Sequence, residues 1–444
     1  MRIVILAIGS LGDVQPCVAL GLGLREAGHD IRIVTHASFE PMVSSYGLET
    51  VTVPVDPGVV LESEAGQRWL ASGQNALSLV LTLLPLVDRF VRQCIMECWR
   101  ACIEAEAIIV SWIGFYLGCH IAEKMRLPLM RAYLQPITPT RAFPNAFVPT
   151  PVALGDQLNL TTHFLFWRFS WHLLRPKLNV IRRELLDMPP LPLNALFWDL
   201  YSPYGMTLYG YSPALLPKPP DWSDRIYVTG YWSLNLSPDW QPDPALADFL
   251  EAGPAPVYVG FGSMKDRNPA ASIELAIKAL AGAKQRGVLL TDWGGISNSD
   301  LPDDIFKVER VPHDWLFPRM AAVVHHGGAG TTAAGLRAEV PSITVPFFAD
   351  QTFWGRLLHK LGAGTRPIPR KQLSAARLAD AIRIAVSDTT MRRRAATLGG
   401  QIRAEDGVAR AVEAVNEYLS LADLPKQGRP YSQDRKMTGP RRRS

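Results

Sequence analysis

The feature that most constrains the fold is an alternation of short apolar runs with longer helical stretches. In the first half, strands are predicted at 2–8, 30–35, 107–112 and 128–134, and helices at 15–27 and from 113 to 125. Strands and helices that alternate at this spacing predict βαβ units and a parallel sheet. The first half is therefore expected to be an α/β domain.

The same rhythm restarts in the second half, after a segment rich in proline between Pro213 and Pro244. Strands are predicted there at 257–261, 287–291, 306–310, 320–325 and 342–346. A proline-rich break between two such halves indicates a domain boundary. We expect domains at 1–235 and 236–420 and a basic, disordered tail at 421–444, with a ligand cleft between the carboxyl ends of the two sheets.

The length, composition and net charge of the chain indicate its size class and which partners to expect. The 444 residues suffice for two or three domains, and 48% of them are hydrophobic. The formal net charge is +5, but the last nineteen residues hold seven basic groups and one acidic group, so the rest of the chain carries −1. A nearly neutral folded part gives no reason to expect a nucleic-acid partner.

The five cysteines are too few and too scattered for a disulfide framework, which predicts a reducing, cytoplasmic location. Cys94, Cys98 and Cys102 are four residues apart, and we expect a buried helix face there rather than a metal site. The apolar start of the chain is too short for a signal peptide, and no run of about eighteen apolar residues predicts a membrane-spanning helix.

Two glycine-containing turns follow predicted strands. Gly9–Pro16 opens the first helix, where free backbone N–H groups favour an anion. Asp13 in this turn is either a helix N-cap or a general base in the cleft. The turn 325–332, His-His-Gly-Gly-Ala-Gly-Thr-Thr, suits a diphosphate, the alternative being a merely tight strand–helix connection. Neighbouring His325 and His326 point to opposite faces of a strand, so at most one faces a ligand.

Asp350 and Gln351 follow the last predicted strand. An acid and an amide there offer acceptors and donors to sugar hydroxyls, the alternative being a solvated helix cap. The chain has no Asp-x-Asp pair and no His-Glu-x-x-His motif, so no metal site is expected.

These motifs, in this order, resemble those of the inverting UDP-glycosyltransferases with two Rossmann-like domains, the GT-B architecture. The similarity is closest to the sterol-glucosyltransferase-like and antibiotic-glycosyltransferase branches. It is carried by Gly9–Pro16, Phe261–Met264, Val311–Phe317, His325–Thr332, and Pro346–Gln351 with Phe353–Gly355.

The resemblance implies a site for a nucleotide-sugar donor, expected to be UDP-glucose, with no other cofactor and no metal. Val311 would meet the base and Asp350 with Gln351 the sugar. The remaining donor-binding residues are expected at the two turns and a facing loop, namely Ser10, Gly12, Ser263, His326, Gly328, Ala329, Gly330 and Thr331. Asp13 corresponds to the proposed general base of this branch. Two departures stand out: Leu11 replaces a common Arg, and Glu339 replaces a common Gly.

Asp13 would take a proton from an acceptor hydroxyl, while backbone N–H groups stabilise the departing diphosphate. Leu, Phe and Trp are frequent at 61–91 and 139–186, which suits an apolar acceptor such as a sterol or other lipid, the equal alternative being ordinary core packing. Basic and aromatic residues at 164–186 also suit peripheral membrane contact. Two other functions stay open: an antibiotic or macrolide glycosyltransferase that uses a deoxysugar, and a non-catalytic nucleotide-sugar-binding protein.

Overall fold

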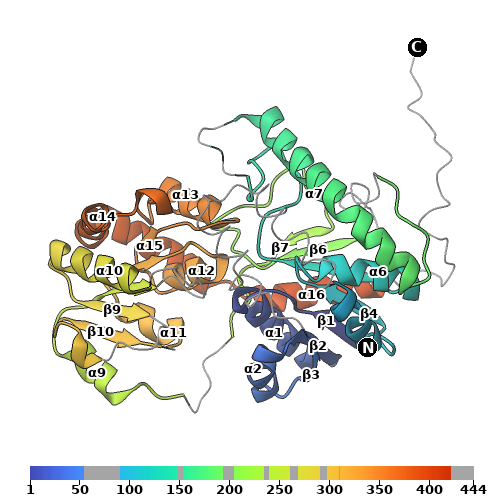
Figure 1. The fold of residues 1–444 in the computed structure, drawn as a ribbon, viewed down its shortest axis with the longest axis horizontal. Coiled ribbons are helices and arrows are strands. Elements are labelled where there is room, and N and C mark those ends of the chain that lie inside the picture. The colour runs from blue at the N-terminus through green and yellow to red at the C-terminus, as the bar shows by residue number, and fades with distance from the viewer. Residues whose placement is uncertain are drawn as a thin grey trace.

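A computed structural model describes residues 1–54, 91–148, 150, 154–193, 205–234, 240–260, 269–290, 298–309 and 311–421. Two separate sheets with parallel strand pairing form two α/β halves, which lie next to each other in Figure 1. The predicted fold class is confirmed. The tail and most of the segment 61–91 lie outside the described residues.

The first sheet has seven strands and contains every strand predicted in the first half. In spatial order the strands are β3 (Glu49–Val53), β2 (Asp30–His36), β1 (Arg2–Leu6), β4 (Ala107–Val110), β5 (Leu129–Tyr133), β6 (Met206–Tyr209) and β7 (Ile226–Val228). Strands β3, β6 and β7 were not predicted, because they are short and contain Thr or Tyr among their apolar residues. The helices of this half are α1 (Leu11–Glu26), η1 (Ala37–Phe39), α2 (Glu40–Ser45), a helical segment at 91–101, α6 (Phe115–Met125) and α7 (Asp156–Glu184).

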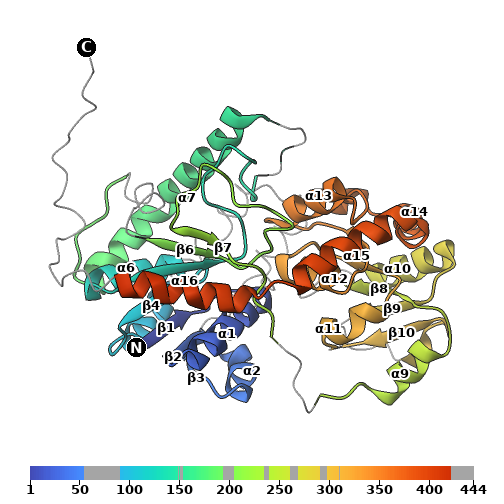
Figure 2. The same cartoon turned by 180° about the vertical axis from the view of Figure 1, so that it is seen from behind.

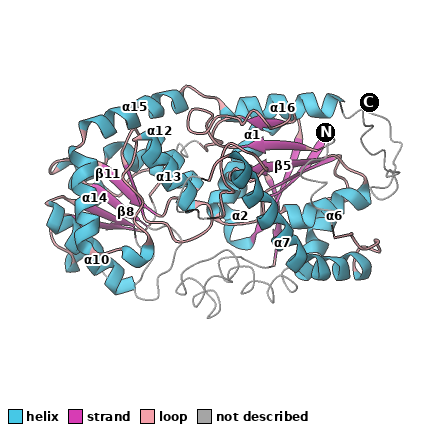
Figure 3. Ribbon diagram, turned by 90° about the horizontal axis from the view of Figure 1, so that it is seen from above, coloured by secondary structure: helices cyan, strands magenta, loops and turns pink. Residues whose placement is uncertain are grey.

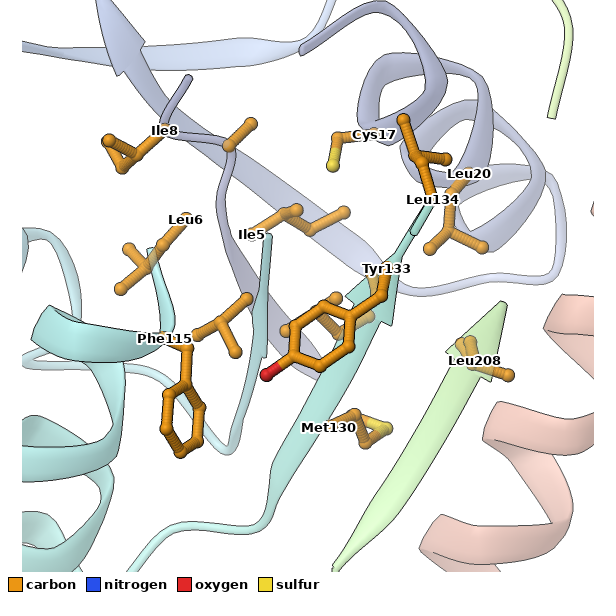
Figure 4. Close-up of a cluster of buried hydrophobic side chains, with 14 of the residues drawn as sticks. Ile5, Leu6, Ile8, Cys17, Leu20, Phe115, Met130, Tyr133, Leu134 and Leu208 are labelled. Carbon is orange, nitrogen blue, oxygen red and sulfur yellow. The ribbon is translucent and has the colours of Figure 1, made fainter. Parts of the chain in front are cut away.

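The core of the first half lies on both faces of this sheet. Figure 4 shows Ile5 and Leu6 of β1 gathered with Phe115 of α6 and with Met130 of β5. All four are buried. A parallel sheet covered on both faces needs continuous apolar strands, which is why β1 and β4 were recognisable in the sequence. Cys94, Cys98 and Cys102 are also buried in this core, as predicted.

The second sheet has five strands, again in a parallel arrangement. In spatial order they are β10 (Ile305–Val308), β9 (Gly287–Leu290), β8 (Val257–Gly260), β11 (Ala322–His325) and β12 (Ser342–Thr344). The surrounding helices are α9 (Pro244–Glu251), α10 (Pro269–Ala283), η2 (Asn298–Asp300), α11 (His313–Leu316), η3 (Phe317–Arg319), α12 (Ala329–Arg337), α13 (Gln351–Leu361), η4 (Arg370–Gln372), α14 (Ala375–Ser387) and α15 (Thr389–Arg403).

The last described helix, α16 (Gly407–Leu421), returns to the first half and packs on α1 (Figure 2). The helices approach so closely that a Cβ at Gly23 would lie 2.4 Å from a methyl carbon of Val408. His29 Nε2 and Asn416 Oδ1 are 2.7 Å apart across the same contact. The strands of the two sheets fall within 1–235 and 236–420, and the boundary itself stays a prediction.

Candidate active site

The turn between β1 and α1 is built around the Asp13 carboxylate. The backbone N–H and the hydroxyl of Ser10 both donate to Asp13 Oδ2, each at 2.9 Å. Gly9 has φ +146°, and a Cβ there would lie 2.5 Å from Asp13 Oδ2, so only glycine fits. This capping box starts α1 four residues earlier than predicted. The N-cap of α1 is thus Ser10, and Asp13 is the third helical residue that completes the capping box, so the interpretation of Asp13 as the N-cap itself is wrong. Its role as a base stays a prediction.

Burial raises the pKa of Asp13 above its ordinary value. Hydrogen bonds from Ser10 and from the Gln135 side chain oppose this rise because they stabilise the charged carboxylate. A carboxylate with a raised pKa is a stronger proton acceptor, which suits a general base.

Two residues that hold this turn were not predicted. Gln135 follows β5, and its Oε1 is buried without a hydrogen-bond partner among the described residues. His36 ends β2, is fully buried, and its Nε2 accepts a hydrogen bond of 3.1 Å from the Gly9 N–H. Each is a polar residue at the carboxyl end of a strand. That position is the only feature of the sequence that could have predicted a role at this turn.

The second turn links β11 to α12 and exposes backbone donors. The first described α-helical backbone bond runs from Thr332 N–H to Gly328 O at 2.9 Å, so the N–H groups of Ala329, Gly330 and Thr331 precede the helical hydrogen-bond ladder. Gly330 is exposed, Gly328 and Thr331 are half-buried, and Ala329 is almost fully buried. A Cβ at Gly328 would lie 2.4 Å from His326 Nε2, which explains that glycine.

The two histidines of this turn have different roles. His325 is fully buried, and its Nδ1 accepts a hydrogen bond of 3.0 Å from the Gly327 N–H. His326 is half-buried, and burial together with the nearby His313 lowers its pKa to about 4. Both rings are therefore neutral at neutral pH, and an anion here would be held by N–H dipoles rather than by a charged side chain.

Unpartnered polar atoms mark the same turn. His326 Nδ1 and Thr332 Oγ1 are buried and have no hydrogen-bond partner within the described part of the chain. Such groups are unfavourable unless a ligand or water satisfies them. Among the described residues, no group of three or more His, Cys, Asp or Glu side chains is placed to hold a metal ion. The donors present fit a diphosphate.

Asp350 and Gln351 lie at the start of α13. Asp350 is only 7% exposed, and its Oδ2 accepts a hydrogen bond of 2.7 Å from Trp354 Nε1. Asp350 is therefore the N-cap of α13, as the alternative interpretation expects, but it is buried rather than solvated. Gln351 is buried, and its Oε1 accepts hydrogen bonds from the backbone N–H groups of Phe347 and Phe348 at 2.7 and 3.1 Å. Gln351 thus shapes the loop that precedes Asp350.

Asp350 lies close enough to the first half to interact with Asp13. Burial, with a smaller contribution from Asp13, raises the pKa of Asp350 to about 7. The helix α13 contacts the first half through ring pairs: Phe353 with Phe143, at a centroid separation of 5.5 Å, and Trp354 with Tyr211, at 5.6 Å. Asp13 and Asp350 therefore interact electrostatically, and the two halves are in contact beside Asp350.

The structure gives fewer contacts for the other residues predicted to bind the donor. Val311 is half-buried and precedes α11, where His313 stacks on Phe317 at 4.2 Å and lowers the pKa of His326. Ser10 and Gly12 are exposed at the start of α1, a helix that contacts α12. Ser263 lies outside the described residues.

Comparison with solved structures defines the class of fold. The glycotransferase of kitacinnamycin aligns with a TM-score of 0.69 and 18% identity, covering 94% of this chain and 99% of that one. CalG4, the calicheamicin glycosyltransferase, aligns at 0.66 and 19% identity, covering 94% and 98%. The fold is therefore the GT-B fold of glycosyltransferases.

Sequence comparison identifies the family. The profile of the glycosyltransferase family 28 N-terminal domain matches residues 3–144, and that of the erythromycin biosynthesis protein CIII-like C-terminal domain matches 288–417. Sterol 3-beta-glucosyltransferases UGT80A2 and UGT80B1 of Arabidopsis thaliana are 37% and 35% identical over 95% and 94% of this chain. The Emericella nidulans enzyme of the same name is 37% identical over 95%. The chain belongs to the sterol 3-beta-glucosyltransferase family. It spans 66% and 68% of the two plant relatives and 30% of the fungal one.

Proposed function

We propose that this chain is an inverting glycosyltransferase that moves glucose from UDP-glucose to the hydroxyl of a sterol. The observation that carries the proposal is the contact between the two halves at α13, which follows Asp350 and meets the half that contains Asp13 through the ring pairs Phe353–Phe143 and Trp354–Tyr211. The names of the full-length relatives support the sterol acceptor and the glucosyl group.

The donor would lie mainly on the second half. The N–H groups at the start of α12 and the unpartnered Thr332 Oγ1 and His326 Nδ1 would bind the diphosphate. Val311 would meet the uracil base, and Ser263 would contribute to diphosphate binding. The Asp350 carboxylate, held by the Trp354 indole, would accept hydrogen bonds from sugar hydroxyls.

The chemistry follows from these positions. Asp13 would remove the proton of the acceptor hydroxyl as its oxygen attacks the anomeric carbon of the sugar. The bond from that carbon to the diphosphate oxygen breaks, and UDP leaves from the opposite face, so the configuration inverts. The oriented N–H groups and the positive end of α12 would stabilise the charge that develops on the diphosphate.

The acceptor would approach over an aromatic cluster that consists of Trp112, Phe147, Phe166 and Trp167. Phe147 stacks between Trp112 and Phe166, with centroid separations of 5.6 and 5.4 Å, and Trp167 meets Trp112 edge-on at 5.1 Å. Trp167 and Trp171 are buried, so for these two residues the ordinary-core interpretation holds. The half-buried Trp112, Phe147 and Phe166 supply apolar surface suited to a sterol ring system.

We also propose a reducing, cytoplasmic setting, supported by five cysteines that are all free thiols, four of them buried. The function is tested by mass spectrometry of reactions that pair UDP-glucose or a TDP-deoxysugar with a sterol or a macrolide aglycone. A sterol hexoside formed with UDP-glucose supports the proposal. A macrolide glycoside alone indicates the antibiotic alternative, and no product with any pair indicates a non-catalytic binding protein.

A further inference from the structure

The helix α7 presents an apolar stripe to solvent. Leu158, Leu165 and Phe169 are 55%, 63% and 37% exposed. Their spacing of seven and four residues places them on one face of the helix. Nine large hydrophobic side chains are exposed in the described part of the chain, and three of them lie on this face, so the exposure is concentrated rather than scattered.

The charge on α7 has a single sign over most of its length. Residues 157–183 contain five basic residues and no Asp or Glu. One of the five, Arg182, is internal and forms a bidentate ion pair with Glu123 of α6 at 2.7 and 3.1 Å, which fixes the helix to the first half. Lys177 is half-buried, and the half-buried Arg175 donates to Leu191 O at 3.2 Å. Arg168 and Arg183 are exposed and make the outer side of α7 cationic.

The inner face of the same helix leads toward the site. Phe166 and Trp167 belong to the aromatic cluster, which continues through Phe147 to Trp112. Trp112 follows Ser111, whose hydroxyl donates to Ile8 O at 2.7 Å, and Ile8 precedes the turn that holds Asp13. One helix thus connects an exposed apolar stripe with the aromatic cluster, whose Trp112 neighbours the residue that contacts Ile8.

Figures 1 and 2 both place α7 along the outer margin of the first half, on the side away from α16, and Figure 3 shows it at the edge of the molecule. None of the described helices is long and apolar enough to cross a membrane. Helix α7 is instead amphipathic, with apolar residues on one stripe and basic residues beside it.

We infer that α7 seats the protein on an anionic lipid bilayer. Leu158, Leu165 and Phe169 enter the boundary between headgroups and acyl chains, while the basic side chains contact anionic headgroups. The part of this inference that concerns the acceptor rests on the proposed function. A sterol dissolves in lipid and hardly in water, so a bilayer at α7 delivers it next to the aromatic cluster without an aqueous step.

Vesicle flotation tests the membrane contact directly. The wild-type chain is mixed with phosphatidylcholine vesicles with and without phosphatidylserine, and the bound fraction is compared with that of Leu165→Ser/Phe169→Ser. Both side chains are exposed, so the fold should tolerate their loss. The matched control is Ile384→Ser on α14, which removes an apolar side chain that is 51% exposed.

The wild type and Ile384→Ser should float with the anionic vesicles, and added salt should weaken their binding. The double variant should bind at least about tenfold more weakly. Equal binding by all three proteins, or binding that ignores the anionic lipid, would overturn the inference. So would a wild-type dimer in sedimentation velocity that the double variant dissociates, because the stripe would then be an interface between copies.

A second assay separates this inference from the proposed function. Transfer to a sterol embedded in anionic vesicles is compared with transfer to the same sterol carried by cyclodextrin. The double variant should lose at least about tenfold activity on vesicles and keep wild-type activity with cyclodextrin. Equal loss in both would refute a role for α7 in delivery. If the wild type transfers nothing to the sterol in either form, the proposed function fails, while flotation still decides the membrane contact.

Discussion

The buried carboxylate of Asp350 should destabilise the fold at neutral pH, and its replacement should therefore stabilise it. Asp350→Asn keeps an oxygen that can accept the Trp354 Nε1–H and removes the charge. Burial raises the pKa of Asp350 from 3.8 to about 7, so the folded state binds a proton more tightly than the unfolded state does. Stability then falls as the pH rises through this window.

The magnitude follows from the size of the shift. A difference of about three pKa units, at about 1.4 kcal/mol each, corresponds to an upper bound of about 4 kcal/mol above pH 7. Near pH 5 the same shift lowers the free energy of unfolding by only about 2 kcal/mol, and below pH 4 this loss of stability vanishes. The unfolding free energy of Asp350→Asn, relative to that of the wild type, should therefore increase by about 2 kcal/mol between pH 5 and pH 7.5.

Urea unfolding of the wild type and of Asp350→Asn at these two pH values measures this difference. Asp248→Asn serves as the matched control, because Asp248 is an exposed carboxylate on α9. A stability difference for Asp350→Asn that does not change with pH, or a less stable variant at pH 7.5, would refute the reasoning. The same variant should bind UDP-glucose more weakly if Asp350 holds the sugar.

Three further predictions concern the catalytic turn, the diphosphate turn and a strained loop. Asp13→Asn should lower kcat by about 10²–10⁴-fold, and isothermal titration should show UDP binding unchanged; near-normal turnover would remove Asp13 from the mechanism. A Cβ at Gly330 meets nothing within 4 Å, so Gly330→Ala should fold normally. It should nevertheless raise the KM for the donor about tenfold, because the diphosphate would occupy the space of the added methyl group. Gly400→Ala on α15, where a Cβ also meets nothing, is the control and should leave KM unchanged. Glu339 has φ +64°, a conformation that glycine adopts without strain. Glu339→Gly should therefore raise the unfolding free energy measured by calorimetry by about 1 kcal/mol, although it loses the ion pair with Arg403. Glu339→Gln, which keeps the side chain, should not raise the unfolding free energy.

The sequence predicted the central strands because these are buried on both faces. β1 contains Ile3-Val-Ile-Leu6 without interruption, and β4, β8 and β11 are similarly apolar. Strand β3 at the sheet edge, Glu-Thr-Val-Thr-Val, is half-exposed and alternates, so its pattern is weaker. The left-handed conformation of Glu339 explains why a glycine is commoner at that position.

The candidate site was predictable where its residues are neighbours in sequence. Asp13, the turn after β11, and Asp350 each lie in a short motif between a strand and a helix. Trp354 lies four residues after Asp350 on the same helix, whereas His36 and Gln135 act on the turn of Asp13 from other places in the chain. Their roles depend on which strands are adjacent, and the order β2-β1-β4-β5 cannot be read from spacing along the sequence.

The most direct test of the central claim is the anomeric configuration of the product. UDP-glucose carries its sugar in the α configuration, so attack by a sterol hydroxyl opposite the leaving diphosphate must give a β-glucoside. The three-bond coupling of the anomeric proton in the NMR spectrum of the purified product distinguishes the two forms. The account predicts a sterol β-glucoside that the wild type forms and Asp13→Asn does not. An α-glucoside, or a product formed equally well without the Asp13 carboxylate, would contradict it.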